Sequence, residues 1–250
     1  MRAAFIGTAF VTAVGGCGSS PLEAVTLDPQ SLSQNLVAHW TFDDGSGTTV
    51  ADSSGNGHDG TLIGGTWLTT GRFGGALTLA SGDTVSVASF PQATASWTVS
   101  LWTRSSSAGL AASTTDFSTI VSTENAFAGG WEIHLDNRPD RGRYDAAYFA
   151  GSTVDDYVVV YCSCIEPDSW IHLTAVWNGD LAQMTLYDDD QPIDELATPS
   201  PILMGDATLY IGTWNQGARY FIGDIDDFAI WSRALQQPEI ALLSQQPPSP

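Results

Sequence analysis

From residue 36 to residue 235 the chain is a succession of short segments in which apolar and polar residues alternate. These segments are rich in Val, Ile, Thr, Trp and Tyr, and they are separated by Gly, Asn, Asp or Pro. β-Branched and aromatic residues suit the half-buried surface of a strand, whereas the separating residues suit turns. Many short strands at close spacing predict an all-β sandwich or barrel. We predict strands at 36–42, 76–79, 84–87, 97–104, 118–122, 130–136, 144–150, 156–161, 170–178, 181–187, 207–212 and 225–231.

A single short helix is predicted near the C-terminus. Residues 238–243 read PEIALL, with Pro238 in a first-turn position, where its missing N–H costs nothing. The region before it holds all nine tryptophans, enough large apolar side chains for one core. We therefore predict one domain over residues 36–245, followed by a disordered tail at 246–250.

The N-terminus resembles a bacterial export signal. Arg2 precedes a short apolar run, and the sequence VGGC at residues 14–17 resembles a lipobox, in which the cysteine is acylated and becomes the first mature residue. A helix of the apolar run at residues 3–14 would be about 18 Å long, too short for a bilayer core of roughly 30 Å. We predict a signal peptide at 1–17, a lipid anchor on Cys17 and a flexible linker at 18–35. The alternative is an ordinary cleaved signal. If the host has two membranes, Gly18, directly after the cysteine, favours sorting of the lipoprotein to the outer membrane.

The chain is strongly acidic. It has 28 acidic residues, 8 arginines and no lysine, and its net charge is −20. Such a surface repels nucleic-acid backbones and anionic lipid heads, so we do not expect nucleic-acid binding. The acidic side chains serve solubility, and some of them are candidates for holding calcium.

A set of short motifs carries a family resemblance. In chain order they are AHWTFDDG (38–45), DSSGNGHDG (52–60), RFGGAL (72–77), WTVSLW (97–102), WIHLTAV (170–176), LYIG (209–212), GDIDDFAIW (223–231) and RAL (233–235). Together they resemble the laminin G-like, concanavalin A-like jelly-roll domains of bacterial surface proteins, over about residues 36–245. The resemblance implies a two-sheet antiparallel jelly-roll sandwich with its first and last strands side by side. It also implies binding to glycans, proteins or calcium.

The loop at residues 52–60 is a candidate calcium site. Asp52, Asn56 and Asp59 offer side-chain oxygens, and the glycines between them allow the backbone to turn its carbonyls inward. The spacing is not that of an EF-hand loop. The alternative is that Asp52 and Asn56 cap turns through side-chain hydrogen bonds.

Further calcium ligands follow from the family resemblance. It implies that Asp43, together with Asp226 or Asp227, lies near this loop. We choose Asp226 because alternation places it on the same strand face as Phe228 and Ile230, where a carboxylate needs a partner. The predicted metal ligands are therefore Asp43, Asp52, Asn56 and Asp226. The acidic run 188–190, by contrast, is predicted to be a solvated hairpin turn.

Catalysis is the less favoured alternative. Related jelly rolls include retaining β-glucanases, whose two glutamates flank an aspartate at alternate positions of one strand. Here Glu132, His134 and Asp136 share a face, but the second glutamate is missing and a histidine stands at the centre. We predict a polar outer face and no enzymatic activity. A glycosidase remains the third hypothesis.

The remaining cysteines are Cys162 and Cys164. In an exported protein they are expected to be oxidised, although a disulfide across an extended pair only two residues apart would be strained. Two alternatives stay open for these cysteines: they form a small structural disulfide, or they are free buried thiols. A redox role is less favoured.

These features predict a lipid-anchored extracytoplasmic binding module that recognises carbohydrate or a surface glycoconjugate. Trp214, Asn215 and Tyr220, on and after the loop at 213–219, could form an aromatic platform beside amide groups, and Trp131 is a weaker addition. For any one tryptophan the alternative is core packing. The second hypothesis for the whole protein is a structural or adhesive envelope protein whose partner is another protein.

Overall fold

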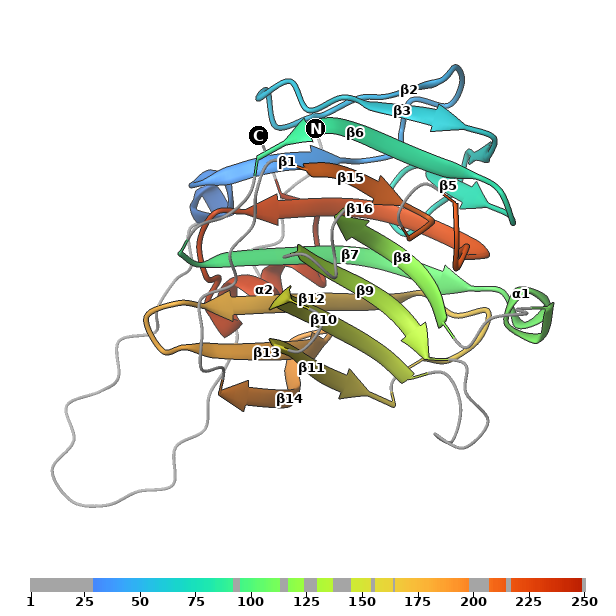
Figure 1. The fold of residues 1–250 in the computed structure, drawn as a ribbon. Coiled ribbons are helices and arrows are strands. Elements are labelled where there is room, and N and C mark those ends of the chain that lie inside the picture. The colour runs from blue at the N-terminus through green and yellow to red at the C-terminus, as the bar shows by residue number, and fades with distance from the viewer. Residues whose placement is uncertain are drawn as a thin grey trace, which may run out of the picture.

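The structure is a computed structural model that describes residues 29–91, 95–112, 117–123, 130–136, 145–153, 156–163, 165–197, 207–214 and 217–248. Two antiparallel eight-stranded sheets lie one in front of the other (Figure 1). The predicted all-β, two-sheet jelly roll is therefore confirmed. The first and last strands of the domain are neighbours, as expected, because β1 pairs with β16.

The first sheet, sheet A, has the order β14-β13-β12-β7-β16-β5-β4, and β1 also pairs with β16. Its strands are β1 (Leu36–Trp40), β4 (Thr66–Leu68), β5 (Ala76–Leu79), β7 (Trp97–Ser105), β12 (Ile171–Asn178), β13 (Gln183–Asp188), β14 (Gln191–Ala197) and β16 (Gly223–Trp231). The second, sheet B, has the order β11-β10-β9-β8-β15-β6-β3-β2. Its strands are β2 (Thr49–Val50), β3 (Gly60–Ile63), β6 (Thr84–Phe90), β8 (Phe117–Thr123), β9 (Gly130–Asp136), β10 (Asp145–Thr153), β11 (Asp156–Cys162) and β15 (Ala207–Ile211). Each predicted strand is present, whereas β2, β3, β4 and β14 were not predicted.

The main core fills the space between the two sheets. Alternation along β9 directs Trp131, Ile133 and Leu135 into this core. The ring of Trp131 packs against that of Trp97 on β7, with 5.0 Å between the centroids. Contacts of this kind join the sheets and remove large aromatic surfaces from water, so the tryptophans stabilise the sandwich.

A second, smaller core covers part of the outer face of sheet A. It is formed by the 3-10 helix η1 (Pro29–Ser33), the helix α2 (Gln237–Leu243) and outward side chains of the sheet. Leu32 is fully buried there, and its carbonyl oxygen accepts a hydrogen bond of 2.7 Å from Trp231 Nε1. Residues 29–35 are thus part of the domain and not of a flexible linker, which corrects the predicted boundary at residue 36.

The predicted C-terminal helix is present as α2. Pro238 lies in its first turn, and the carboxylate of Glu239 accepts a hydrogen bond from the backbone N–H of Gln236 at 2.9 Å. Beyond it, Pro248 is buried and Gln246 is exposed, whereas residues 249–250 of the predicted tail lie outside the described residues. A six-residue helix that was not predicted, α1 (Ser107–Ala112), follows β7. Among the described residues no helix is long and apolar enough to cross a membrane.

A β-bulge in β16 reverses one expected orientation. Asp226 pairs with Trp102, but the next pair along this ladder joins Ala229 to Ser100, so β16 has one extra residue. Asp227 in the bulge has a left-handed φ of 44°. Asp226 therefore lies on the outer face of sheet A with Trp102. The prediction that it shares a face with Phe228 and Ile230 is wrong, because strict alternation does not continue through a bulge.

Candidate functional site

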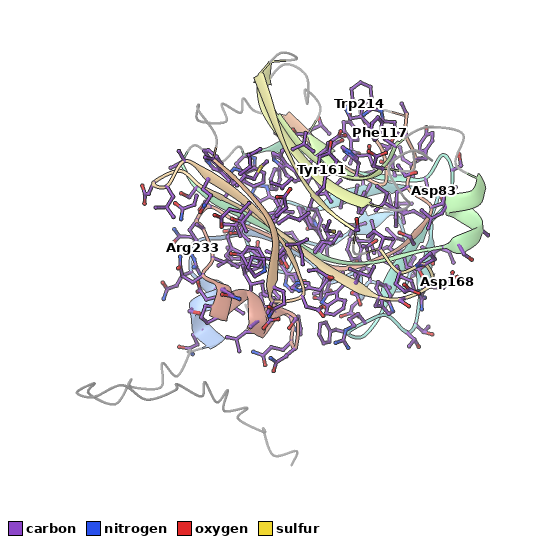
Figure 2. The ribbon with its side chains drawn as sticks, turned by 90° about the horizontal axis from the view of Figure 1, so that it is seen from below. Asp83, Phe117, Tyr161, Asp168, Trp214 and Arg233 are labelled. Carbon is purple, nitrogen blue, oxygen red and sulfur yellow. The ribbon has the colours of Figure 1, made fainter. Side chains whose placement is uncertain are left out.

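The loop after β15 folds back over the outer face of sheet B. The backbone N–H of Trp214 donates to the carbonyl of Ala218 at 2.9 Å, which closes the loop on itself. The N–H of Thr119 on β8 then donates to the carbonyl of Arg219 at 2.7 Å, which ties the loop to the sheet. Trp214 and Phe117 consequently lie next to each other at one end of the molecule (Figure 2).

Arg219 connects the aromatic rings of this surface. Its guanidinium lies 4.8 Å from the ring centroid of Trp214 and 4.9 Å from that of Phe117. Guanidinium groups are attracted to aromatic faces at such distances. The backbone at Arg219 has a φ of 54°, a left-handed conformation that an arginine adopts only when its surroundings require it.

A buried acidic group lies directly beneath. Glu132 on β9 is only 4% exposed, and its Oε1 lies 3.6 Å from Arg219 Nη1 and 2.9 Å from His134 Nδ1. Its other oxygen accepts a hydrogen bond of 3.4 Å from Thr119 Oγ1. A buried carboxylate needs such partners, because an unpaired charge away from water is costly. The cluster thus presents a charged guanidinium in a defined position between two aromatic rings.

The predicted ligand-binding residues divide between the surface and the core. Trp214 and Tyr220 are half-buried and belong to this loop, whereas Asn215 lies outside the described residues. Trp131 is 2% exposed and packs in the main core against Trp97, so its ring does not add to the platform.

Sequence reasoning missed Arg219 and Phe117, and it treated Glu132 and His134 as a solvated polar face. The alternation that places Glu132, His134 and Asp136 on one face is confirmed, but all three are buried. The available signal was an arginine directly before Tyr220 in a loop of an arginine-poor chain. Nothing local to that loop indicates that it crosses β8 and reaches Glu132.

Asp52 and Asn56 hold the loop that follows β1. Asp52 Oδ1 accepts hydrogen bonds from the backbone N–H groups of His39 and Ser54, and Oδ2 accepts one from His58. Although partial burial acts in the opposite direction, these hydrogen bonds lower the pKa of Asp52. Asn56 Nδ2 donates to the carbonyls of Leu36 and Val37. Both residues thus have the turn-capping contacts that were the alternative to metal binding.

Asp43 and Asp226 meet at a different loop, residues 71–75. Asp226 Oδ2 accepts hydrogen bonds from the backbone N–H of Arg72 and of Phe73, and Asp43 Oδ1 accepts one from Gly75. Asp226 is fully buried, its Oδ1 has no hydrogen-bond partner among the described residues, and burial raises its pKa to about 7. No group of three or more His, Cys, Asp or Glu residues in the described part of the chain is arranged to hold a metal ion.

The oxidation state of one cysteine is defined in the described part of the chain. Cys162, at the end of β11, is disulfide-bonded, so this cysteine is oxidised and is not a free thiol. The other two cysteines of the chain, Cys17 and Cys164, lie outside the described residues.

Comparison with protein families identifies the fold family. A laminin G model described as the concanavalin A-like lectin/glucanases superfamily matches residues 79–241. The chain belongs to this superfamily. No curated protein sequence matches the chain.

Solved structures share the family's architecture at low sequence identity. Domain 4 of AbnA, a GH43 extracellular arabinanase from Geobacillus stearothermophilus solved with arabinotriose, is 21% identical, with a TM-score of 0.64 over 84% of this chain and 98% of that one. The binding domain of botulinum neurotoxin serotype D is 17% identical, with a TM-score of 0.67 over 86% of this chain and 51% of that one. The same toxin's ligand-binding domain with N-acetylneuraminic acid aligns with a TM-score of 0.66 at 17% identity, over 87% and 52% of the two chains. The chain spans about half the length of the toxin domains. Its likeness to these solved structures establishes the fold alone.

Proposed function

We propose that this domain is a carbohydrate-recognition module whose ligand contacts Trp214, Tyr220 and Arg219 on the outer face of sheet B. The observation that carries the proposal is the position of Arg219, which lies against two aromatic rings and is paired with the buried Glu132. A sugar has C–H faces that pack on aromatic rings and hydroxyl groups that accept hydrogen bonds from a guanidinium.

The arrangement is organised before a ligand arrives. The hydrogen bond from Thr119 to Arg219 and the contact with Glu132 restrict the loop and the side chain, so little freedom remains to be lost on binding. Glu132 is flanked at the alternate position by His134 and not by a second glutamate, which favours recognition over glycoside cleavage. The two solved relatives that contain arabinotriose or N-acetylneuraminic acid support a sugar ligand.

A glycan array followed by calorimetry tests this proposal. We expect the protein lacking residues 1–17 to retain at least one glycan, and Trp214→Ala to weaken that binding by about tenfold or more, which is about 1.4 kcal/mol. Trp67→Ala, which removes a half-buried tryptophan from β4 of sheet A, is the matched control and should leave the same binding unchanged. An array without hits, together with capture of one defined surface protein, would favour the adhesive hypothesis instead.

The proposal includes export and lipid anchoring through Cys17, on the grounds of the N-terminal sequence. More than one acyl chain would make the anchoring durable. Intact-mass analysis of the protein recovered from host membranes tests it. We expect the mature chain to begin at an acylated Cys17, and Cys17→Ser to release the protein from the membrane fraction. A mature chain without an acyl group would remove the anchor from the proposal.

Calcium is a separate part of the proposal. The candidate ligands are Asp43 and the buried Oδ1 of Asp226, which has no hydrogen-bond partner among the described residues. A cation held by them would stabilise the loop 71–75. Asp52 and Asn56 are engaged with backbone groups at another loop. Calorimetric titration of the chelator-treated protein should give one site and a rise of several degrees in Tm. If calcium gives neither a heat of binding nor a change in Tm, the calcium site is excluded.

A further inference from the structure

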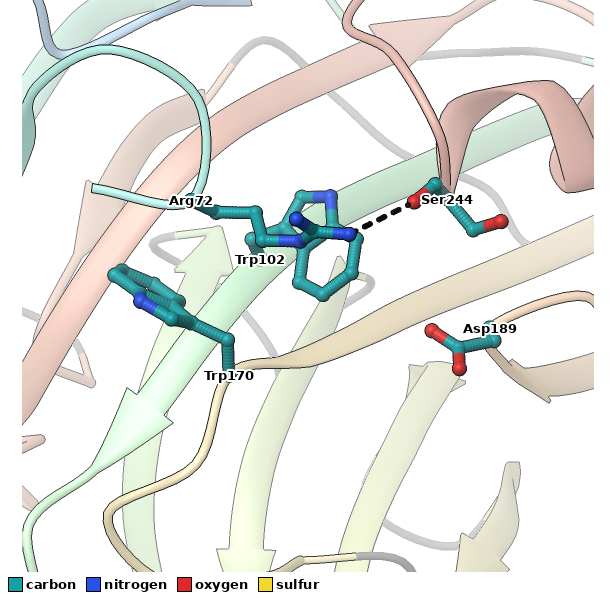
Figure 3. Close-up of a pocket in the computed structure, with 5 residues that line it drawn as sticks. All are labelled: Arg72, Trp102, Trp170, Asp189 and Ser244. Carbon is teal, nitrogen blue, oxygen red and sulfur yellow. Dashed lines mark hydrogen bonds between the residues drawn. The ribbon is translucent and has the colours of Figure 1, made fainter.

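A pocket of about 410 Å³ lies on the outer face of sheet A, on the opposite side of the sandwich from Trp214. It is lined by Arg72, Trp102, Trp170, Asp189 and Ser244 (Figure 3). These residues come from the β4–β5 loop, β7, the start of β12, the β13–β14 turn and the end of α2. The volume falls in the range of small-ligand sites, about 300–1,000 Å³.

Arg72 is exceptional among the arginines that the structure describes. Arg104, Arg219 and Arg233 each contact a carboxylate, at 2.7, 3.6 and 2.8 Å respectively. Arg72 has no such partner in the described part of the chain, although the protein carries a net charge of −20. Its guanidinium lies 4.3 Å from the ring centroid of Trp102 and makes one long hydrogen bond, 3.4 Å, to the carbonyl of Ser244. Most of its N–H donors therefore remain available in the pocket.

The backbone beneath Arg72 is held in place. Asp226 Oδ2 accepts hydrogen bonds from the N–H groups of Arg72 and Phe73, at 2.6 and 2.9 Å. The N–H of Gly71 donates to the carbonyl of Gly74 at 2.7 Å, and a Cβ at residue 71 would come within 1.9 Å of the carbonyl oxygen of Gly75. This tight loop fixes the origin of the Arg72 side chain, and Trp102 supports its guanidinium from below.

The opposite walls of the pocket differ in chemistry. The ring of Trp170 is half-buried and is supported by Arg104, whose guanidinium lies 4.8 Å from its centroid. Arg104 is itself paired with Asp224. Asp189 is exposed in the turn across the pocket and offers carboxylate oxygens (Figure 3). A ligand in the pocket thus meets an aromatic face, a guanidinium and a hydrogen-bond acceptor.

We propose that this pocket binds a sugar that bears a carboxylate, such as a uronic or sialic acid residue. Its carboxylate would pair with the guanidinium of Arg72, its ring would pack on Trp170, and its hydroxyl groups would donate to Asp189. Guanidinium and carboxylate match as paired donors and acceptors. A phosphate is less suitable, because its second negative charge would lie near Asp189. The domain would then hold two separate glycan sites on opposite faces.

The test uses the methyl glycosides of galacturonic, glucuronic and N-acetylneuraminic acid, with methyl galactoside as the neutral comparison. Binding to the chain lacking residues 1–17 is followed by calorimetry and by the indole N–H resonances of the tryptophans. We expect at least one acidic glycoside to bind about tenfold or more tightly than the neutral one and to shift the resonance of Trp170. If none of the three acids binds more tightly than methyl galactoside, the proposal is overturned.

Variants separate this pocket from the surface around Trp214. Arg72→Gln keeps both backbone N–H bonds to Asp226 and removes the guanidinium, so the fold should persist and acid binding should fall by about tenfold or more. Trp170→Ala should weaken binding similarly, whereas Trp214→Ala should leave it unchanged. Acid binding that survives Arg72→Gln but is lost in Trp214→Ala would assign the acidic sugar to the other site and overturn the proposal. Loss of neutral-glycan binding only in Trp214→Ala would support the proposed function independently.

Discussion

The carboxylate of Asp226 on the last strand of sheet A holds the backbone N–H of Arg72 at a distance of 2.6 Å. The two residues are 154 positions apart in the sequence, and the contact ties the β4–β5 loop to the bulged part of β16. The same oxygen holds the N–H of Phe73. A fully buried carboxylate thus organises the loop that carries Arg72, whose guanidinium lines the sheet A pocket.

Two substitutions of Asp226 should distinguish the contribution of its hydrogen bonds to stability from the contribution of its charge. Asp226→Ala removes the acceptor of two backbone N–H groups, and we expect it to lower the free energy of unfolding by about 1–3 kcal/mol at every pH. Asp226→Asn keeps an acceptor oxygen and removes the buried charge. Urea unfolding in a calcium-free buffer measures both. Equal destabilisation by Ala and Asn at pH 8 would show that the charge, and not the acceptor, holds the loop.

The pH dependence of the same residue follows from its raised pKa. Because burial raises the pKa of Asp226 to about 7 from a usual value of 3.8, the folded chain holds a proton that the unfolded chain releases. The contribution of Asp226 to stability therefore falls as pH rises from 4 to 7, by at most about 1.4 kcal/mol per pH unit, and is constant above that window. Asp226→Asn should abolish this contribution. An identical pH profile in the wild type and Asp226→Asn would contradict the assignment.

The pH dependence of stability that His172 contributes should have the opposite sign to that of Asp226. Burial beneath Trp102 lowers the pKa of His172 to about 3, and its Nε2 lies 2.7 Å from Ser100 Oγ. The unfolded chain takes up a proton near pH 6.5 that the folded chain excludes, so stability should decrease as pH falls from 6.5 toward 3. His172→Gln in the Asp226→Asn background should flatten this decrease. Unfolding curves at pH 4, 5, 6 and 7 test it, and an unchanged slope would refute it.

Leu32 tests where the domain begins. Its side chain is fully buried in the small core with Trp231 and Ile240, and Leu32→Ala should cost about 2–5 kcal/mol. Ser33→Ala, at the exposed neighbouring position, is the control and should change stability by less than about 0.5 kcal/mol. Thermal melts compare the three proteins. A neutral Leu32→Ala would return residues 29–33 to the linker.

Glu132 and Arg219 should be energetically coupled. A double-mutant cycle of Glu132→Gln and Arg219→Ala is expected to give a coupling energy of about 0.5–3 kcal/mol. The lower part of this range is expected, because the side chain of Arg219 is 24% exposed and water screens the pair. Both variants should also weaken retention of the glycan that needs Trp214. Additive effects on stability would mean that the two side chains act independently.

Much of the architecture could be predicted because alternation of apolar and polar residues is a local property. β5 and β9 begin and end where their apolar patterns do, and the predicted face of Glu132, His134 and Asp136 is the observed one. β14 could not be found in this way. Its seven residues include Pro192 and bury no continuous face, so only pairing with β13 at the sheet edge makes them a strand.

The sequence by itself determined an all-β fold of many short strands and the C-terminal helix, because short-range periodicity and turn residues encode them. The resemblance of its motifs to a known family implied the two-sheet sandwich and the pairing of the first and last strands. Only the tertiary structure decided what surrounds each charged group. The bulge at Asp227 moved Asp226 to the outer face, and the fold-back of one loop brought Arg219 over Glu132. Segments far apart in the chain placed Trp170 and Asp189 around Arg72. Such neighbours depend on strand order and loop closure, which no local pattern records.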